Sequence, residues 1–264
     1  MSQPSPRRGA SSVAWLAALA FGPTVALAQV PSTAATLMNL EPQLPTEVED
    51  AEVTPQGVRE LQLPIRMVRE RDSDNRFLVE PRFQIGLLPR LQATIGVPLV
   101  VGSSDRTNSG NLRGDLLYKF TNEGGVLPAL AGGFGIELPT GKDAEGTDTT
   151  LRLVATKTLG ARPGTHQIHG NAIWRRNDDP RAGERDDTSR FILGYSTPLS
   201  DSTVIVADLV RGHGRLGATS MQTVYEVGIR QAFTRGTTLA LGLARGRGPD
   251  SPNWQVTAGF QSQF

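Results

Sequence analysis

The chain closes with Asn253-Trp254-Gln255-Val256-Thr257-Ala258-Gly259-Phe260-Gln261-Ser262-Gln263-Phe264, in which apolar residues alternate with polar or small ones. Side chains of a β-strand point alternately to its two faces, so one face of this stretch suits lipid and the other suits water. The apolar face carries Trp254, Val256, Ala258, Phe260 and Phe264. The stretch therefore predicts a strand that separates lipid from water.

Similar alternating segments recur upstream, each of about ten residues and separated by turn-forming residues. They predict an all-β fold, a transmembrane antiparallel up-and-down β-barrel of about 12 strands over residues 58–264. The predicted strands are 58–69, 77–88, 91–101, 112–122, 129–139, 149–159, 165–175, 189–199, 203–212, 222–233, 237–246 and 253–264. Long connections alternate with tight ones, which predicts outer loops and short periplasmic turns. An even strand number places both barrel ends on the same side of the membrane, and the short turns on that side predict that both ends are periplasmic.

The first 28 residues have the organisation of a secretory signal peptide. Arg7 and Arg8 precede an apolar run over 13–27, and Ala26-Leu27-Ala28 supplies small residues for a cleavage site before Gln29. A single spanning helix is the alternative, but the run is shorter than the roughly 20 residues that such a helix needs. The sequence therefore predicts export and cleavage after Ala28.

Residues 29–57 combine several prolines with many acidic residues and show little periodicity. Segments of this composition rarely supply the apolar surface that a packed core needs. We therefore expect a flexible periplasmic leader over 29–57, followed by the barrel over 58–264.

The composition excludes several classes of protein. The chain has no cysteine, so disulfides, thiolate metal sites and a cysteine lipid anchor are excluded. A formal net charge of +1 argues against a nucleic-acid partner. Beyond the signal peptide no stretch approaches the roughly 20 apolar residues of a spanning helix. A barrel escapes this requirement because only alternate residues face lipid.

The polar face of the predicted strands carries charges of both signs. The residues expected to line the lumen are Glu80, Arg82, Arg113, Asp115, Glu137, Arg152, Asp208, Glu226 and Arg230. A barrel of this strand number encloses more space than side chains fill, so we expect a narrow polar lumen with a bonded network and weak ion selectivity. The alternative is that these charges fill the interior and the pore is closed.

Two resemblances refine this prediction. The closing strand resembles the C-terminal strand of bacterial outer-membrane β-barrels, which implies that Phe264 is an assembly signal for the barrel-assembly machinery.

The second resemblance is to the outer-membrane barrel family of meta-pathway phenol-degradation or "transporter" proteins. It is carried by Leu112-Arg113-Gly114-Asp115-Leu116-Leu117-Tyr118-Lys119-Phe120, Leu127-Pro128-Ala129-Leu130-Ala131, Gly135-Ile136-Glu137-Leu138-Pro139-Thr140-Gly141-Lys142 and Ile85-Gly86-Leu87-Leu88-Pro89-Arg90-Leu91-Gln92. In the last of these stretches Pro89 replaces the family's usual polar turn residue. The family implies passage of small, aromatic or hydrophobic compounds.

Few residues suit catalysis or metal binding. His166 and His169 are three apart, so on a strand they point to opposite faces and cannot chelate one ion. The segment around Ser196 lacks the second glycine of a nucleophile elbow. We expect no catalytic residue, no cofactor and no metal.

Calcium binding by acidic groups in the outer loops is an open alternative, although the arginines interleaved with these groups favour salt bridges. The calcium candidates are Asp143, Glu145, Asp148, Asp178, Asp179, Glu184, Asp186 and Asp187.

These observations predict an outer-membrane channel or facilitator for small, aromatic or hydrophobic solutes in a Gram-negative envelope. The expected partners are outer-membrane lipid and lipopolysaccharide, the barrel-assembly machinery and a small-molecule solute, with no nucleic acid. One alternative is a partner-binding or structural barrel without an open pore. The other is an outer-membrane hydrolase, which would need a histidine paired with a serine or acidic groups on the lipid face or at the outer rim.

Overall fold

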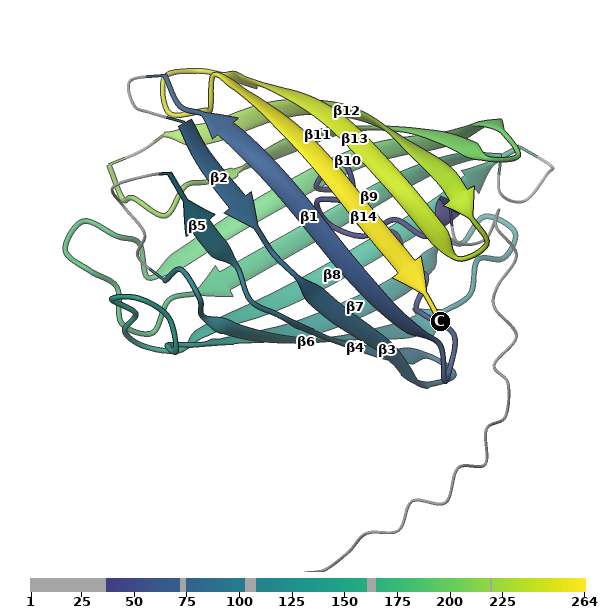
Figure 1. Cartoon of the computed structure of the whole chain (residues 1–264), viewed down its shortest axis with the longest axis horizontal. Coiled ribbons are helices and arrows are strands. Elements are labelled where there is room, and N and C mark those ends of the chain that lie inside the picture. The colour runs from purple at the N-terminus through teal and green to yellow at the C-terminus, as the bar shows by residue number, and fades with distance from the viewer. Residues whose placement is uncertain (1–36, 72–74, 103–107, 161–164, 219) are drawn as a thin grey trace, which may run out of the picture.

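The computed structural model describes residues 37–71, 75–102, 108–160, 165–218 and 220–264. In this part of the chain one antiparallel sheet closes on itself into a barrel (Figure 1). Pairing of β1 with β14 closes the ring. The strands are Arg59–Arg69 (β1), Asn75–Val79 (β2), Arg82–Leu88 (β3), Leu91–Gly96 (β4), Leu99–Val101 (β5), Leu112–Thr121 (β6), Ala129–Leu138 (β7), Asp148–Leu159 (β8), His166–Arg176 (β9), Asp187–Ser200 (β10), Thr203–His213 (β11), Met221–Thr234 (β12), Thr237–Arg247 (β13) and Trp254–Gln263 (β14).

Two of the wall strands are interrupted at prolines. Both β2 and β3 pair with β1, and the break between them falls at Glu80-Pro81. The break between β4 and β5 falls at Val97-Pro98. Proline has no backbone N–H to donate, so the hydrogen-bond ladder stops there. The barrel therefore has 12 wall strands, as predicted from the sequence.

The connections differ at the two ends of the barrel. Two-residue links at 89–90, 201–202 and 235–236 lie at one end, which we call the turn end. Long connections such as 177–186 lie at the other, the loop end. The C-terminus lies at the turn end (Figure 1). The predicted alternation of long and short connections is thus confirmed.

The wall is apolar outside and polar inside. Outward residues such as Ile95 and Leu243 are 56% and 59% exposed, whereas the inward Gln84 and Gln92 are 1% and 3% exposed. This is the reverse of a water-soluble protein and matches a barrel surrounded by lipid. The predicted assignment of faces is confirmed. Within the described residues no helix is long and apolar enough to cross a membrane.

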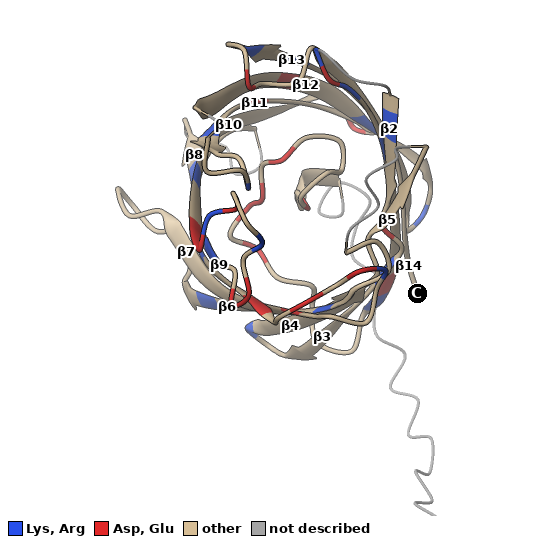
Figure 2. Cartoon of the chain, turned by 90° about the vertical axis from the view of Figure 1, so that its left-hand side faces the viewer, with Lys and Arg blue, Asp and Glu red and all other residues tan. Residues whose placement is uncertain are grey.

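Residues 37–58, which we call the inner segment, lie inside the barrel (Figures 1 and 2). Leu37, Leu40 and Val48 are each 1% exposed and pack against interior residues of the wall, among them Ile192 and Val206. The expected flexible leader over 29–57 is therefore corrected from residue 37 onward. The physical reason is that its apolar residues find a core, and its polar groups find partners, in the barrel interior. Residues 29–36 and the predicted signal peptide lie outside the described residues.

Candidate functional site in the barrel interior

The inner segment folds into a loop with its tip at residues 43–46. Two hydrogen bonds join its arms: the Leu40 amide donates to Asp50 Oδ2 at 3.1 Å, and the Asp50 amide donates to the Leu40 carbonyl at 3.2 Å. At the tip the Gln43 amide donates to the carbonyl of Thr46 at 2.6 Å. The returning arm then runs along the wall to the start of β1. The segment is therefore an ordered structure inside the lumen.

Side chains of the wall accept hydrogen bonds from the backbone of the returning arm. The donor amides and their acceptors are Glu47 to Glu226 (2.6 Å), Val48 to Asp208 (2.8 Å), Glu49 to Asn171 (2.9 Å), Ala51 to Thr156 (2.9 Å) and Thr54 to Gln92 (2.8 Å). These acceptors belong to β12, β11, β9, β8 and β4, so the arm follows the wall around the barrel. A buried amide without a partner costs about 1–3 kcal/mol, so each bond removes a penalty that would otherwise oppose the internal position.

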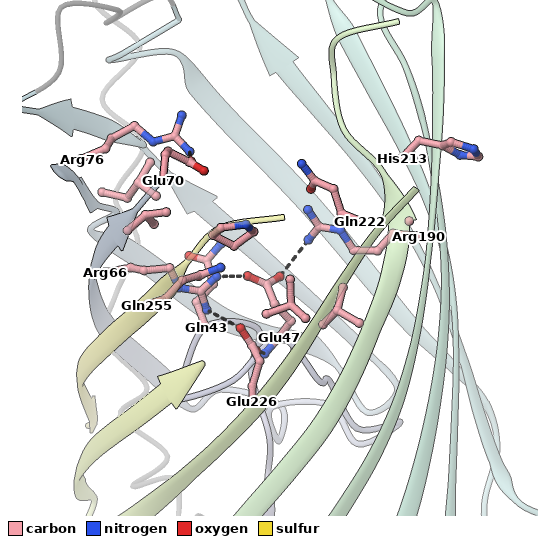
Figure 3. Close-up of a pocket in the computed structure, with 16 residues that line it drawn as sticks. Gln43, Glu47, Arg66, Glu70, Arg76, Arg190, His213, Gln222, Glu226 and Gln255 are labelled. Atoms are coloured by element: carbon pink, nitrogen blue, oxygen red, sulfur yellow. Dashed lines mark hydrogen bonds and ion pairs between the residues drawn. The ribbon is translucent and has the colours of Figure 1, made fainter. Parts of the chain in front are cut away.

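Acidic side chains of the inner segment meet basic side chains of the wall. The segment carries five acidic residues and no basic residue. Glu47 contacts both Arg66 and Arg190, the latter at 2.9 Å from Nη1 to Oε2 (Figure 3). Glu52 lies 2.6 Å from Lys119 Nζ. Among the described residues Arg190 and Lys119 form no other ion pair. The segment therefore neutralises cations that the wall leaves uncompensated.

A third ion pair lies between these two. Glu49 Oε2 is 3.7 Å from Arg152 Nε, and Arg152 also lies 3.4 Å from Asp115. Arg190 and Arg66 lie near the loop end of their strands, whereas Lys119 lies near the turn end of β6. The cations that contact the segment therefore extend through much of the length of the lumen.

Inward-facing glycines make room for the tip of the inner segment and for Val48. A Cβ atom at Gly228 or Gly242 would collide with Pro45, one at Gly259 with Leu44, and one at Gly194 with Val48. Gly228, Gly242 and Gly259 lie on the neighbouring strands β12, β13 and β14 and together leave a shallow recess in the wall, whereas Gly194 lies on β10, two strands from β12. Shape as well as charge thus matches this part of the wall to the segment.

The nine residues predicted to line the lumen all lie on the interior face. On one side Arg82 and Arg113 pair with Glu80 at 3.0 Å each, and Arg113 also pairs with Glu137 at 2.8 Å. The predicted bonded network is therefore present. Asp208 and Glu226 hold backbone amides of the inner segment, and Asp115 and Arg152 pair with each other.

The ninth residue, Arg230, is fully buried. Its guanidinium donates to the Leu44 carbonyl at 2.7 Å and to Gln261 Oε1 at 2.6 Å. Arg230 therefore anchors the tip of the inner segment instead of bordering a water path. The sequence analysis missed Arg190 and the acidic residues of the segment. The signal that could have found them is a charge imbalance. Residues 37–58 carry acidic but no basic residues, and some basic residues of the predicted strands have no acidic residue at a neighbouring inward position.

A cavity of about 250 Å³, which we call the vestibule, lies between the tip of the inner segment and the loop end. Its charged lining includes Glu47, Arg66 and Arg190 (Figure 3). Its apolar lining includes Val68, Leu78, Val210 and Val224. Arg66 Nη2 is buried and has no hydrogen-bond partner among the described residues. The vestibule thus offers guanidinium groups beside an aliphatic wall.

A serine and a histidine meet inside the barrel, which bears on the hydrolase alternative. His169 Nε2 lies 2.9 Å from Ser196 Oγ, and its Nδ1 lies 3.1 Å from Thr156 Oγ1. A catalytic triad places an orienting carboxylate at the second nitrogen, and here a threonine occupies that place. Ser196 is 0% and His169 1% exposed, beneath the inner segment. The geometry therefore favours a structural role. His166 is exposed on the opposite face, as its spacing from His169 predicted.

Carboxylates at the loop end pair with arginines. Asp148 contacts Arg175, and Glu184 Oε1 lies 2.8 Å from Arg215 Nε. Partial burial acts to raise the pKa of Glu184, but hydrogen bonds from Arg215 and the Arg181 amide outweigh it and lower that pKa. Within the described residues no three metal-ligating side chains gather as a metal site. These contacts favour the salt-bridge interpretation of the acidic loops over calcium.

No family model matches the chain, and no curated protein matches it in sequence. Several solved structures share its fold. The COG4313 outer membrane channel from Pseudomonas putida F1 has a TM-score of 0.60 at 16% identity, covering 85% of this chain and 100% of that one. The KdgM porin has a TM-score of 0.56 at 7% identity, covering 78% and 99%. The NanC porin has a TM-score of 0.54 at 9% identity, covering 78% and 98%.

This chain has the fold of these outer-membrane barrels. At such low identities the similarity shows the fold alone. The finer resemblance to the meta-pathway phenol-degradation family is not confirmed by these matches and stays a prediction.

Proposed function

We propose that the protein is an outer-membrane channel for small solutes whose bore is controlled by the inner segment. The observation that carries this proposal is the vestibule, a polar cavity on the loop side that ends at Gln43 and Glu47 of that segment. The apolar exterior supports a membrane location. We infer that the loop end faces the outside of the cell and the turn end faces the periplasm, because outer-membrane barrels have short periplasmic turns and longer outer loops.

The lining of the vestibule supports a class of solute. Arg190 has a side chain that is 46% exposed, so it is accessible to a solute in the cavity. The aliphatic residues beside it suit an apolar or aromatic body. We infer that small organic solutes with an apolar part pass through, and that those with a carboxylate bind best. This agrees with the solute class that the family resemblance implies.

The proposal is tested by locking the inner segment to the wall. The chain has no native cysteine, and a Cβ built at Gly194 lies 3.0 Å from Val48 Cβ, near the span of about 3.5–4.5 Å that a disulfide requires. In Val48→Cys with Gly194→Cys, we expect low single-channel conductance when the protein is oxidised and higher conductance after reduction. The single Gly194→Cys variant controls for the effect of the substitution at the wall.

Two outcomes contradict the proposal. Equal conductance in the oxidised and reduced states would show that the inner segment does not control the bore. A correctly folded wild-type barrel that never conducts in planar bilayers would favour the alternative of a closed barrel that binds a partner. The observation that supports this alternative is the inner segment, which is buried in the barrel interior.

A further inference from the structure

The outward face of the barrel carries four arginines near the loop end, which we call the rim arginines: Arg69 of β1, Arg211 of β11, and Arg245 and Arg247 of β13. Arg69 and Arg245 both lie opposite Trp254, and Arg211 and Arg247 both lie opposite Thr223. Each pair flanks one intervening strand, a separation of about 10 Å at the normal strand spacing. The four therefore form one patch.

Among the residues that the structure describes, the rim arginines have no acidic partner. Arg211, Arg245 and Arg247 are exposed, and among the described residues none of the four forms an ion pair. Elsewhere on the same rim the situation differs, because Arg176 lies 3.7 Å from Asp187. The outward positions of β5 to β7 near the loop end are apolar, as at Val101 and Leu138. Among the described strand positions of the outward face near the loop end, arginines without an ion pair thus lie on one side of the barrel.

This patch lies where the apolar surface ends. Val227 and Leu243, which are 50% and 59% exposed, lie two residues closer to the turn end than Tyr225 and Arg245. Tyr225 lies directly opposite Arg245, and it is 47% exposed. Aromatic residues at this position mark the level of lipid headgroups in membrane barrels. The arginines therefore lie at headgroup height above a surface suited to acyl chains.

We propose that the rim arginines bind the phosphate groups of a phosphorylated glycolipid in the leaflet that surrounds the loop end. Guanidinium groups bind phosphate through paired, charge-assisted hydrogen bonds, and basic clusters at a membrane surface attract anionic headgroups. The acyl chains of the lipid lie along the exposed Val227 and Leu243. The proposal rests on the outer-membrane location given above, but not on conduction.

The test uses the full-length protein in detergent micelles with fluorescently labelled diphosphoryl lipid A as the probe. For Arg245→Gln with Arg247→Gln we expect about tenfold weaker binding, because two guanidinium–phosphate contacts are lost. Dephosphorylated lipid A should bind wild type and variant equally weakly. Arg59→Gln with Arg235→Gln, at the turn end, is the matched control and should bind like wild type. Heat-modifiable gel migration confirms that each variant is folded.

Three results would overturn the proposal. These are equal binding by the rim variant and wild type, an equal loss in the turn-end control, and displacement of the lipid by inorganic phosphate as readily as by unlabelled lipid A. If the double variant fails to fold, Arg69→Gln with Arg211→Gln tests the same patch from its other strands. A folded barrel that binds the lipid but does not conduct would refute the proposed channel and leave this site in place.

Discussion

The carboxylate of Glu47 lies between Arg66 of β1 and Arg190 of β10, two strands that face each other across the barrel. One side chain of the inner segment thus connects opposite sides of the wall at the base of the vestibule (Figure 3). Both arginines would face the lumen without it, and Arg190 would then have no acidic partner among the described residues. The inner segment therefore changes the charge of the barrel interior as well as filling part of its space.

Removing the carboxylates of the segment should change ion selectivity. In Glu47→Gln with Glu49→Gln and Glu52→Gln, we expect the reversal potential in a potassium chloride gradient to shift toward anions. The reason is that Arg66, Arg190 and Lys119 then act on permeant ions in a confined space where screening is incomplete.

Removal of three carboxylates at the loop end provides the control for this change. Glu145→Gln with Asp178→Asn and Asp179→Asn removes the same formal charge at exposed loop residues that do not line the vestibule, so we expect a much smaller shift. A shift of similar size in both variants would mean that the overall charge of the protein, and not the inner segment, sets selectivity.

The vestibule should distinguish benzoate from benzamide, two solutes of nearly the same shape that differ in charge. In liposomes, uptake of benzoate through the wild-type protein should exceed uptake of benzamide. Arg190→Gln should reduce benzoate uptake by up to about fivefold, the equivalent of the roughly 1 kcal/mol of a partly exposed ion pair. Benzamide uptake should stay unchanged, as should both in Arg235→Gln at the turn end. Equal loss for the two solutes would contradict a role of charge in binding.

Much of the wall could be predicted from the sequence because its signal is local. Alternation with period two assigned the faces, as for Ile95 outside and Gln92 inside. Each predicted wall strand begins and ends within two residues of its observed bounds. The interruptions at Pro81 and Pro98 were missed because alternation continues through both prolines, while the hydrogen bonds do not.

The inner segment could not be predicted in the same way because its partners are distant in sequence. The contact of Glu47 with the Glu226 side chain, for example, spans 179 residues. Its apolar residues lack a strand period and pack on glycines of four different strands. A comparison of the acidic residues in the leader with the unpaired basic residues of the predicted strands would have indicated that the leader lies inside the barrel.

The assignment of faces makes a quantitative prediction for stability. Arginine at Ile95 or Ile229, which are 56% and 38% exposed to the surroundings of the barrel, should cost about 2–4 kcal/mol if they lie near the bilayer midplane. Arginine at Gln92 should cost less, about 1 kcal/mol, mainly because the Thr54 amide loses its acceptor. Urea unfolding in lipid bilayers measures these differences. A cost at Gln92 equal to that at Ile95 would contradict the assignment.

The last residue tests whether the terminal aromatic acts in assembly or only in the folded barrel. The Arg59 amide donates to the Phe264 carbonyl at 3.1 Å, and the Phe264 amide donates to the Arg59 carbonyl at 2.9 Å, so the backbone of Phe264 extends the closing pair of strands. Its side chain is 58% exposed. Phe264→Asp keeps both backbone bonds, and a charge near the interface costs only about 0–1 kcal/mol. The variant should therefore refold in detergent like wild type.

In cells, however, the amount of folded Phe264→Asp in the outer membrane should fall several-fold, as seen by heat-modifiable migration of membrane fractions, if the assembly machinery reads the terminal aromatic. Phe233→Asp is the matched control, because Phe233 is 72% exposed near the same end of β12 but is internal in the chain. It should reduce the folded amount much less. Equal losses in the two variants would indicate that the machinery does not read the terminus and that both changes act through the apolar rim.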